Sequence, residues 1–85
     1  MNRAEQRITL YGTRHCAHCR NAKEFLLQHG IRFREYDVEQ NQRALKELQR
    51  QGARRVPLIL VGDKQLVGFN EQQMIRILRK SGYHV

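Results

Sequence analysis

The 85-residue sequence lacks the segments that would place it in a membrane or outside the cell. Its longest apolar run, residues 56–61, is far shorter than the roughly 20 residues of a transmembrane helix, and its first ten residues contain no signal-type apolar stretch. A single proline and the absence of repeats or low-complexity segments argue against a disordered chain. The sequence therefore predicts one cytoplasmic globular domain over residues 1–85, with no membrane contact.

Acidic residues are half as frequent as basic ones, 8 against 16, and the formal net charge is +8. Clustered lysine and arginine would favour nucleic acid, because they displace counterions from phosphates. Here the basic residues are spread over the whole chain without a dense block or an aromatic-interleaved stripe. We therefore expect a solvated surface that favours acidic proteins or anionic thiols. A different class of function stays open, in which the chain is a basic module that binds nucleic acid or protein and has no enzymatic activity.

Cysteine is also scarce, and the only two cysteines lie together in Cys16-Ala17-His18-Cys19. In a reducing compartment, such a pair is more often catalytic or metal-binding than a structural disulfide. A pair at this spacing can close a small disulfide on itself, which indicates redox chemistry. The alternative is two buried structural thiols.

Hydrophobic periodicity divides the chain into strands and helices in the order β-α-β-α-β-β-α. The first strand-helix-strand unit predicts a parallel pair with a right-handed crossover, and Gly62-Asp63 predicts a tight turn between two antiparallel strands. The expected fold class is α/β, with a four-stranded mixed sheet and helices on both sides. The expected elements cover residues 8–11, 17–29, 31–38, 40–51, 56–61, 65–67 and 71–81.

In such sheets, ligand and catalytic groups gather at the carboxyl ends of the parallel strands, and Cys16 follows the first strand. At a helix start, unpaired backbone N–H groups and the positive end of the dipole favour the thiolate of Cys16, and Arg14 and Arg20 add positive charge. Cys19, one turn later, can then resolve a mixed disulfide.

Two histidines accompany the cysteines. His15 adds positive charge, and His18 is either an exposed spacer or a ring that stabilises the Cys16 thiolate. The four side chains are all potential metal ligands, but tetrahedral zinc needs a second pair from elsewhere, and neighbours on one turn point in different directions. We expect no metal site within the monomer, and a cluster bridging two subunits stays open.

Four features together make residues 7–82 resemble the glutaredoxin family of the thioredoxin fold: Tyr11, the cysteine pair, Val56-Pro57 before an apolar strand, and Gly68 ahead of the last helix. The resemblance implies a thiol-disulfide oxidoreductase with Cys16 as nucleophile and no tightly bound cofactor. It also implies a cis peptide bond before Pro57, with the Val56 backbone pairing with the substrate's cysteine.

The sequence departs from the glutathione-using members at three places. Thr13 stands where they carry Lys or Arg, Arg55 replaces the threonine before Val-Pro, and Phe69 would crowd the cradle for one end of glutathione. The Gly68-Phe69 pair is similar to NrdH-type redoxins, donors to ribonucleotide reductase that are recharged by thioredoxin reductase. The Ala17-His18 insert is typical of neither group.

The resemblance therefore implies disulfide-bearing protein substrates. The reductant would be thioredoxin reductase, or alternatively glutathione as co-substrate with glutathione reductase. The candidate substrate-binding residues are Thr13, Arg14, Arg55, Val56, Pro57, Gly68, Phe69 and Asn70.

Overall fold

The computed structural model describes residues 6–85, which contain one four-stranded mixed sheet. The strands are β1 (Ile8–Gly12), β2 (Arg34–Asp37), β3 (Leu58–Val61) and β4 (Lys64–Val67), in the spatial order β2-β1-β3-β4. β1 pairs in parallel with β2 and antiparallel with β3, and β3 pairs antiparallel with β4. The predicted element order and the predicted strand directions are confirmed.

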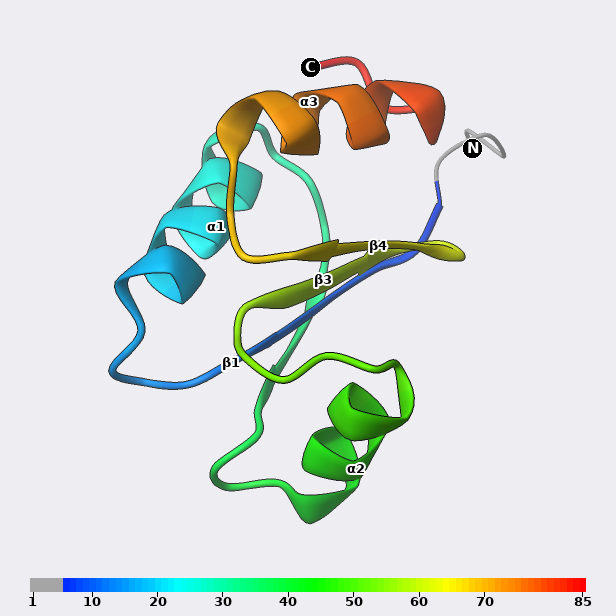
Figure 1. Cartoon of the computed structure of the whole chain (residues 1–85). Coiled ribbons are helices and arrows are strands. Elements are labelled where there is room, and N and C mark those ends of the chain that lie inside the picture. The colour runs from blue at the N-terminus through cyan, green and yellow to red at the C-terminus, as the bar shows by residue number, and fades with distance from the viewer. Residues whose placement is uncertain (1–5) are drawn as a thin grey trace.

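Three helices cover the two faces of this sheet. They are α1 (Ala17–Gln28), α2 (Gln42–Arg50) and α3 (Glu71–Lys80). Figure 1 shows α1 and α3 together on one side of the sheet and α2 alone on the other. None of the helices within residues 6–85 is long and apolar enough to cross a membrane.

The side-chain alternation of the strands fills a separate core on each face. Ile8 and Leu10 of β1 join the larger core under α1 and α3, whereas Tyr11 points into the smaller core under α2. β3 contributes to both cores, with Ile59 in the larger and Leu58 in the smaller, so it is a central strand buried on both faces.

Two predicted strands are longer than the observed ones. β2 begins at residue 34 and not at 31, because the Ile31 N–H bonds the Leu26 carbonyl and so belongs to the end of α1. β3 begins at Leu58 and not at residue 56, because Pro57 has no N–H to give to a strand ladder.

Asparagine side chains set the starts of α2 and α3. The Asn41 Oδ1 accepts a hydrogen bond from the Ala44 N–H, and the Asn70 Oδ1 accepts one from the Gln73 N–H, both at 3.0 Å. Asn70 is therefore the N-cap of α3. α2 is shorter than the predicted 40–51, because Asn41 as N-cap excludes residues 40 and 41 from the helix.

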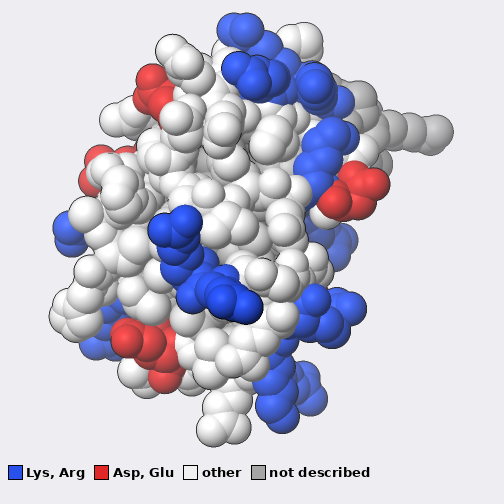
Figure 2. Space-filling model, in the orientation of Figure 1, with Lys and Arg blue, Asp and Glu red and all other residues white. Residues whose placement is uncertain are grey.

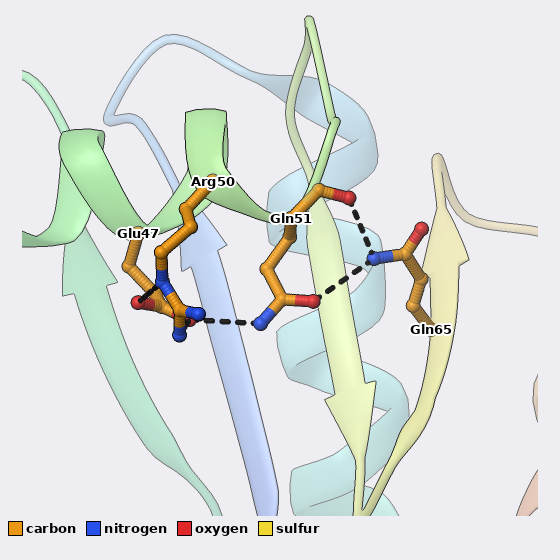
Figure 3. Close-up of polar contacts among 4 residues, drawn as sticks. All are labelled: Glu47, Arg50, Gln51 and Gln65. Atoms are coloured by element: carbon orange, nitrogen blue, oxygen red, sulfur yellow. Dashed lines mark hydrogen bonds and ion pairs between the residues drawn. The ribbon is translucent and has the colours of Figure 1, made fainter.

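A polar network fastens the end of α2 to the edge strand β4 (Figure 3). The Gln65 Nε2 donates to the Gln51 carbonyl at 3.0 Å and to the Gln51 Oε1 at 3.3 Å. The Glu47 carboxylate accepts from the side chains of Gln51 and Arg50, and these hydrogen bonds hold the pKa of Glu47 below its usual range. The network fixes the start of the loop that leads to Pro57.

The charged side chains are distributed over several elements. On the face drawn in Figure 2, basic side chains lie over α3, over α2 and over the loop that leads into β3, with acidic side chains between them. Along the right-hand margin of this view, basic side chains follow one another from α3 down toward α2, with an acidic side chain among them.

Candidate active site

Cys16 caps the amino end of α1, as its position after the first strand predicts. Its backbone is extended (φ −110°, ψ 111°), and its Sγ accepts a hydrogen bond from the Cys19 N–H at 3.1 Å. The same sulfur lies 4.0 Å from the Val56 carbonyl oxygen, to which its S–H donates. Cys16 is partly exposed, so a sulfur beside helix-start N–H groups is accessible to a substrate disulfide.

Cys19 is the buried partner of Cys16. It is only 6% exposed, and burial, together with the hydrogen bond to the Cys16 side chain, raises the pKa of the Cys19 thiol to about 12. Both thiols are free in this structure. The two sulfurs therefore differ in accessibility: Cys16 is partly exposed, as an attacking thiol must be, and Cys19 is buried, where it can reach a disulfide formed on Cys16.

Gly12 makes room for Cys19 and is a site residue that sequence reasoning missed. A Cβ on Gly12 would lie 3.0 Å from the Cys19 Sγ and 3.1 Å from its Cβ, which is tighter than most Cβ contacts in proteins. From sequence alone, Gly12 looks like an ordinary turn residue. The feature of the sequence that could have identified it is the position of this glycine, at the carboxyl end of the strand that leads to the cysteines.

The loop that leads into β3 approaches Cys16 through Val56. The Val56–Pro57 peptide bond is cis, as the resemblance implies, and the Pro57 carbonyl accepts from the Gly68 N–H at 2.8 Å. Gly68 adopts a φ of 81°, a left-handed conformation that favours glycine. The structure thus brings Val56 beside Cys16 and ties Pro57 to Gly68.

The two residues after Gly68 are largely engaged within the fold. The Phe69 ring lies 5.9 Å from the Phe25 ring of α1 and packs at the margin of the larger core. Asn70 uses its side-chain oxygen to cap α3, which leaves its NH₂ group as the part that could contact a substrate.

A charged cavity of about 280 Å³ opens on the other side of the cysteines, toward β2. Two ion pairs border it: the Lys23 Nζ lies 3.0 Å from the Glu35 Oε1, and the Arg14 Nε lies 3.9 Å from the Asp37 Oδ2. Asp37 was missed by sequence reasoning, although it is the last residue of the second parallel strand. The lining residues include Gly12, Thr13, Arg14, Cys16, Cys19, Arg20, Lys23, Glu35 and Asp37.

His15, His18 and Arg55 are exposed, and none of them lines this cavity. Within residues 6–85, neither histidine ring makes a hydrogen bond or an ion pair. The described part of the chain also brings together no group of three or more His, Cys, Asp or Glu side chains that could hold a metal ion. Any influence of the two histidines on Cys16 must therefore act through space.

A helix-capping cysteine, a buried cysteine one turn later and a facing cis-proline on this mixed sheet define a thiol-disulfide oxidoreductase of the thioredoxin fold. The sequence model of the Glutaredoxin family matches residues 8–67, and the chain belongs to this family. It is 30% identical over 71 residues to the glutaredoxin-like protein NrdH of Escherichia coli (strain K12), covering 84% of this chain and 88% of that protein. Within the family, it is therefore an NrdH-type redoxin.

Solved structures agree with this assignment. The NrdH-redoxin from Escherichia coli, whose structure was solved to explain a thioredoxin-like activity profile, superimposes with a TM-score of 0.76 at 30% identity, covering 82% of this chain and 92% of that one. A glutaredoxin from Archaeoglobus fulgidus also has a TM-score of 0.76, at 26% identity and 87% coverage of both chains. The fold class predicted from sequence is confirmed.

Proposed function

We propose that this protein reduces disulfides in other proteins, with Cys16 as the nucleophile and Cys19 as the resolving thiol. The observation that carries the proposal is the position of the Cys16 sulfur. It accepts the Cys19 N–H at 3.1 Å and lies 4.0 Å from the Val56 carbonyl, partly exposed, while Cys19 is buried one turn away.

In the proposed cycle, the Cys16 thiolate attacks one sulfur of a substrate disulfide and the other substrate sulfur leaves as a thiolate. The resulting mixed disulfide is held along Val56-Pro57 by backbone pairing. Cys19 then attacks the Cys16 sulfur, the Cys16–Cys19 disulfide forms, and the second substrate thiolate leaves. The substrate gains two electrons and the cysteine pair loses two.

We propose thioredoxin reductase as the enzyme that returns these electrons. Support comes from Thr13 and Arg55, which replace residues typical of glutathione users, and from Phe69, which occupies the place after Gly68 and packs against Phe25. The similarity to NrdH supports the same reductant. Such a reductant and reduced cysteines both fit a cytoplasmic protein.

Glutathione is the second candidate, favoured by exposed basic groups around the cysteines. The Arg14 side chain is 77% exposed, and its ion pair with Asp37 is long, at 3.9 Å. Arg14 is therefore available to bind a glutathione carboxylate. Arg54 and Arg55 are also exposed, next to Val56 in the loop that leads into β3.

One assay run in two forms separates these reductants. Oxidised protein is mixed with thioredoxin reductase and NADPH, or with glutathione, glutathione reductase and NADPH, and NADPH consumption is followed in the presence of a protein disulfide. We expect turnover with thioredoxin reductase, and faster turnover with glutathione would reverse the choice. No turnover in either form, with salt-sensitive retention on DNA or RNA, would favour the basic binding module.

Two cysteine variants test the chemistry itself. Cys16→Ser should abolish disulfide reduction, and Cys19→Ser should accumulate a mixed disulfide that mass spectrometry detects. Full activity in Cys16→Ser would refute the assignment.

We further propose that His15 and His18 tune the site through their charge, since both are exposed beside the amino end of α1. His18→Ala should make the Cys16–Cys19 disulfide less oxidising, with the Ala17→Ser variant as a neighbouring control. An unchanged reduction potential would remove His18 from the mechanism.

A further inference from the structure

The register of β1 and β2 places Asp37 beside Gly12, the glycine against which Cys19 packs. Gly12 and Asp37 are paired across the two strands, and the Val38 N–H bonds the Gly12 carbonyl at 3.0 Å. Paired residues on neighbouring strands project toward the same face of a sheet. Because the missing Gly12 side chain would point at the Cys19 sulfur, the Asp37 side chain projects toward the same side.

The neighbouring pair in the register identifies that side as the α1 face. Leu10 packs in the core under α1, and its partner Glu35 reaches Lys23 of α1 at 3.0 Å. Asp37 and Cys19 also line the same cavity of about 280 Å³, which has room for bridging water. The carboxylate and the buried thiol thus line one half-open pocket.

Cys19 needs a proton acceptor if it is to resolve a mixed disulfide. The thiolate, not the thiol, is the attacking species, and burial holds the Cys19 thiol protonated at neutral pH, with its pKa at about 12. Solvent reaches this thiol poorly, because Cys19 is 6% exposed. A base inside the cavity would supply what solvent cannot.

The cavity contains two carboxylates, and Asp37 is the better placed. Glu35 forms an ion pair with Lys23 at 3.0 Å. Glu35 is paired with Leu10, which lies two residues before Gly12 on the same face of the sheet. The Asp37 Oδ1 accepts the Glu39 N–H at 2.9 Å, which orients the carboxylate and leaves Oδ2 facing Arg14 at 3.9 Å. The other charged or titratable groups that line the cavity are Cys16, Arg20, Lys23 and Tyr36.

We propose that the Asp37 carboxylate accepts the Cys19 proton during the resolving step, directly or through one water. As the S–H proton moves to Asp37, the Cys19 sulfur bonds to the Cys16 sulfur, the bond from Cys16 to the substrate sulfur breaks, and its electron pair leaves with the substrate thiolate. In the reverse direction, Asp37 returns the proton to Cys19. This inference rests on the roles proposed above for the two cysteines.

The test is a stopped-flow reaction of reduced protein with an aromatic disulfide that releases a coloured thiolate. Attack by Cys16 releases the first thiolate, and resolution by Cys19 releases the second. Asp37→Asn keeps the side-chain shape and the acceptor for the Glu39 N–H, and Asp37→Glu keeps the carboxylate. Glu35→Gln is the matched control, with the same charge change on the same strand and the same face.

At pH 7, we expect the second release to be about 10²-fold slower in Asp37→Asn, because general-base catalysis contributes factors of about this size. Its rate should then rise roughly tenfold per pH unit, as expected when hydroxide must remove the proton. The parent and Glu35→Gln should instead reach a plateau, Asp37→Glu should recover part of the rate, and the first release should change little.

Two outcomes would overturn the inference. One is that Asp37→Asn releases the second thiolate as fast as the parent does. The other is that Glu35→Gln slows this release as much as Asp37→Asn does, which would show that the rate depends on the total charge of the cavity and not on Asp37. If the parent itself released only one coloured thiolate, as Cys19→Ser should, the roles proposed for the two cysteines would fail instead.

Discussion

The contact between Gly12 and Cys19 predicts that a single methyl group will strain the site. In Gly12→Ala, the added Cβ would lie 3.0 Å from the Cys19 Sγ and 3.1 Å from its Cβ, so Cys19 must move away by a few tenths of an ångström. Overpacking of this kind costs about 1–3 kcal/mol. Gly12 has no positive φ, so the alanine backbone is tolerated, and reduced freedom of the unfolded chain returns about 0.4–1 kcal/mol.

The two contributions leave about 0–2.6 kcal/mol, and we expect the middle of this range, a net destabilisation of the reduced protein of about 1.3 kcal/mol. This lowers the Tm of a domain of this size by roughly 5–10 °C. Calorimetry of the reduced protein measures it directly. The cause can be isolated by a double-mutant cycle with Cys19→Ala, which removes the contact at 3.0 Å and leaves the one at 3.1 Å. We expect a coupling free energy of at least about 0.5 kcal/mol between the two positions.

The reasoning would be refuted if Gly12→Ala were as stable as the parent. It would also be refuted if Gly12→Ala cost the same in the presence and in the absence of the Cys19 sulfur. Thr13→Ala, a substitution at the next residue along the chain, is the matched control and should shift the Tm by much less.

Three further predictions concern the thiols and the helix cap. A limiting amount of iodoacetamide at neutral pH should label Cys16 and spare Cys19, which is buried and has a pKa of about 12; peptide mass spectrometry reads the ratio, and equal labelling would contradict the difference between them. Because burial raises the pKa of Cys19 from 9.0 to about 12 and also raises that of Tyr11, ionisation favours the unfolded chain, so the reduced protein should lose stability as the pH rises from about 9 toward 12. Urea unfolding across this range should show a flatter loss in Cys19→Ser, and an identical loss would exclude Cys19. Asn70→Ala and Asn41→Ala should each cost about 1 kcal/mol as lost N-caps, and only Asn70→Ala should also raise KM; equal KM values would assign Asn70 to the cap alone.

The local chemistry of the sequence determined the elements and the reactive pair. Alternating apolar residues in β1, the all-apolar run of β3 and the caps at Cys16 and Asn70 act over a few residues, so they can be recognised without a fold. The errors fell at element ends: β2 began late because the Ile31 N–H closes the end of α1, a hydrogen bond that periodicity does not reveal.

Which groups surround the pair was decided by tertiary structure, because these groups come from segments far apart in the chain. Val56 lies 40 residues from Cys16 and reaches its sulfur only through the pairing of β3 with β1. The parallel register of β1 with β2 brings Asp37 beside Gly12, and the packing of α1 over that glycine buries Cys19 in the pocket that Asp37 also lines. The sequence therefore specifies that this protein carries two thiols for redox chemistry, whereas the fold decides which thiol is accessible, which is buried, and which carboxylate shares its cavity.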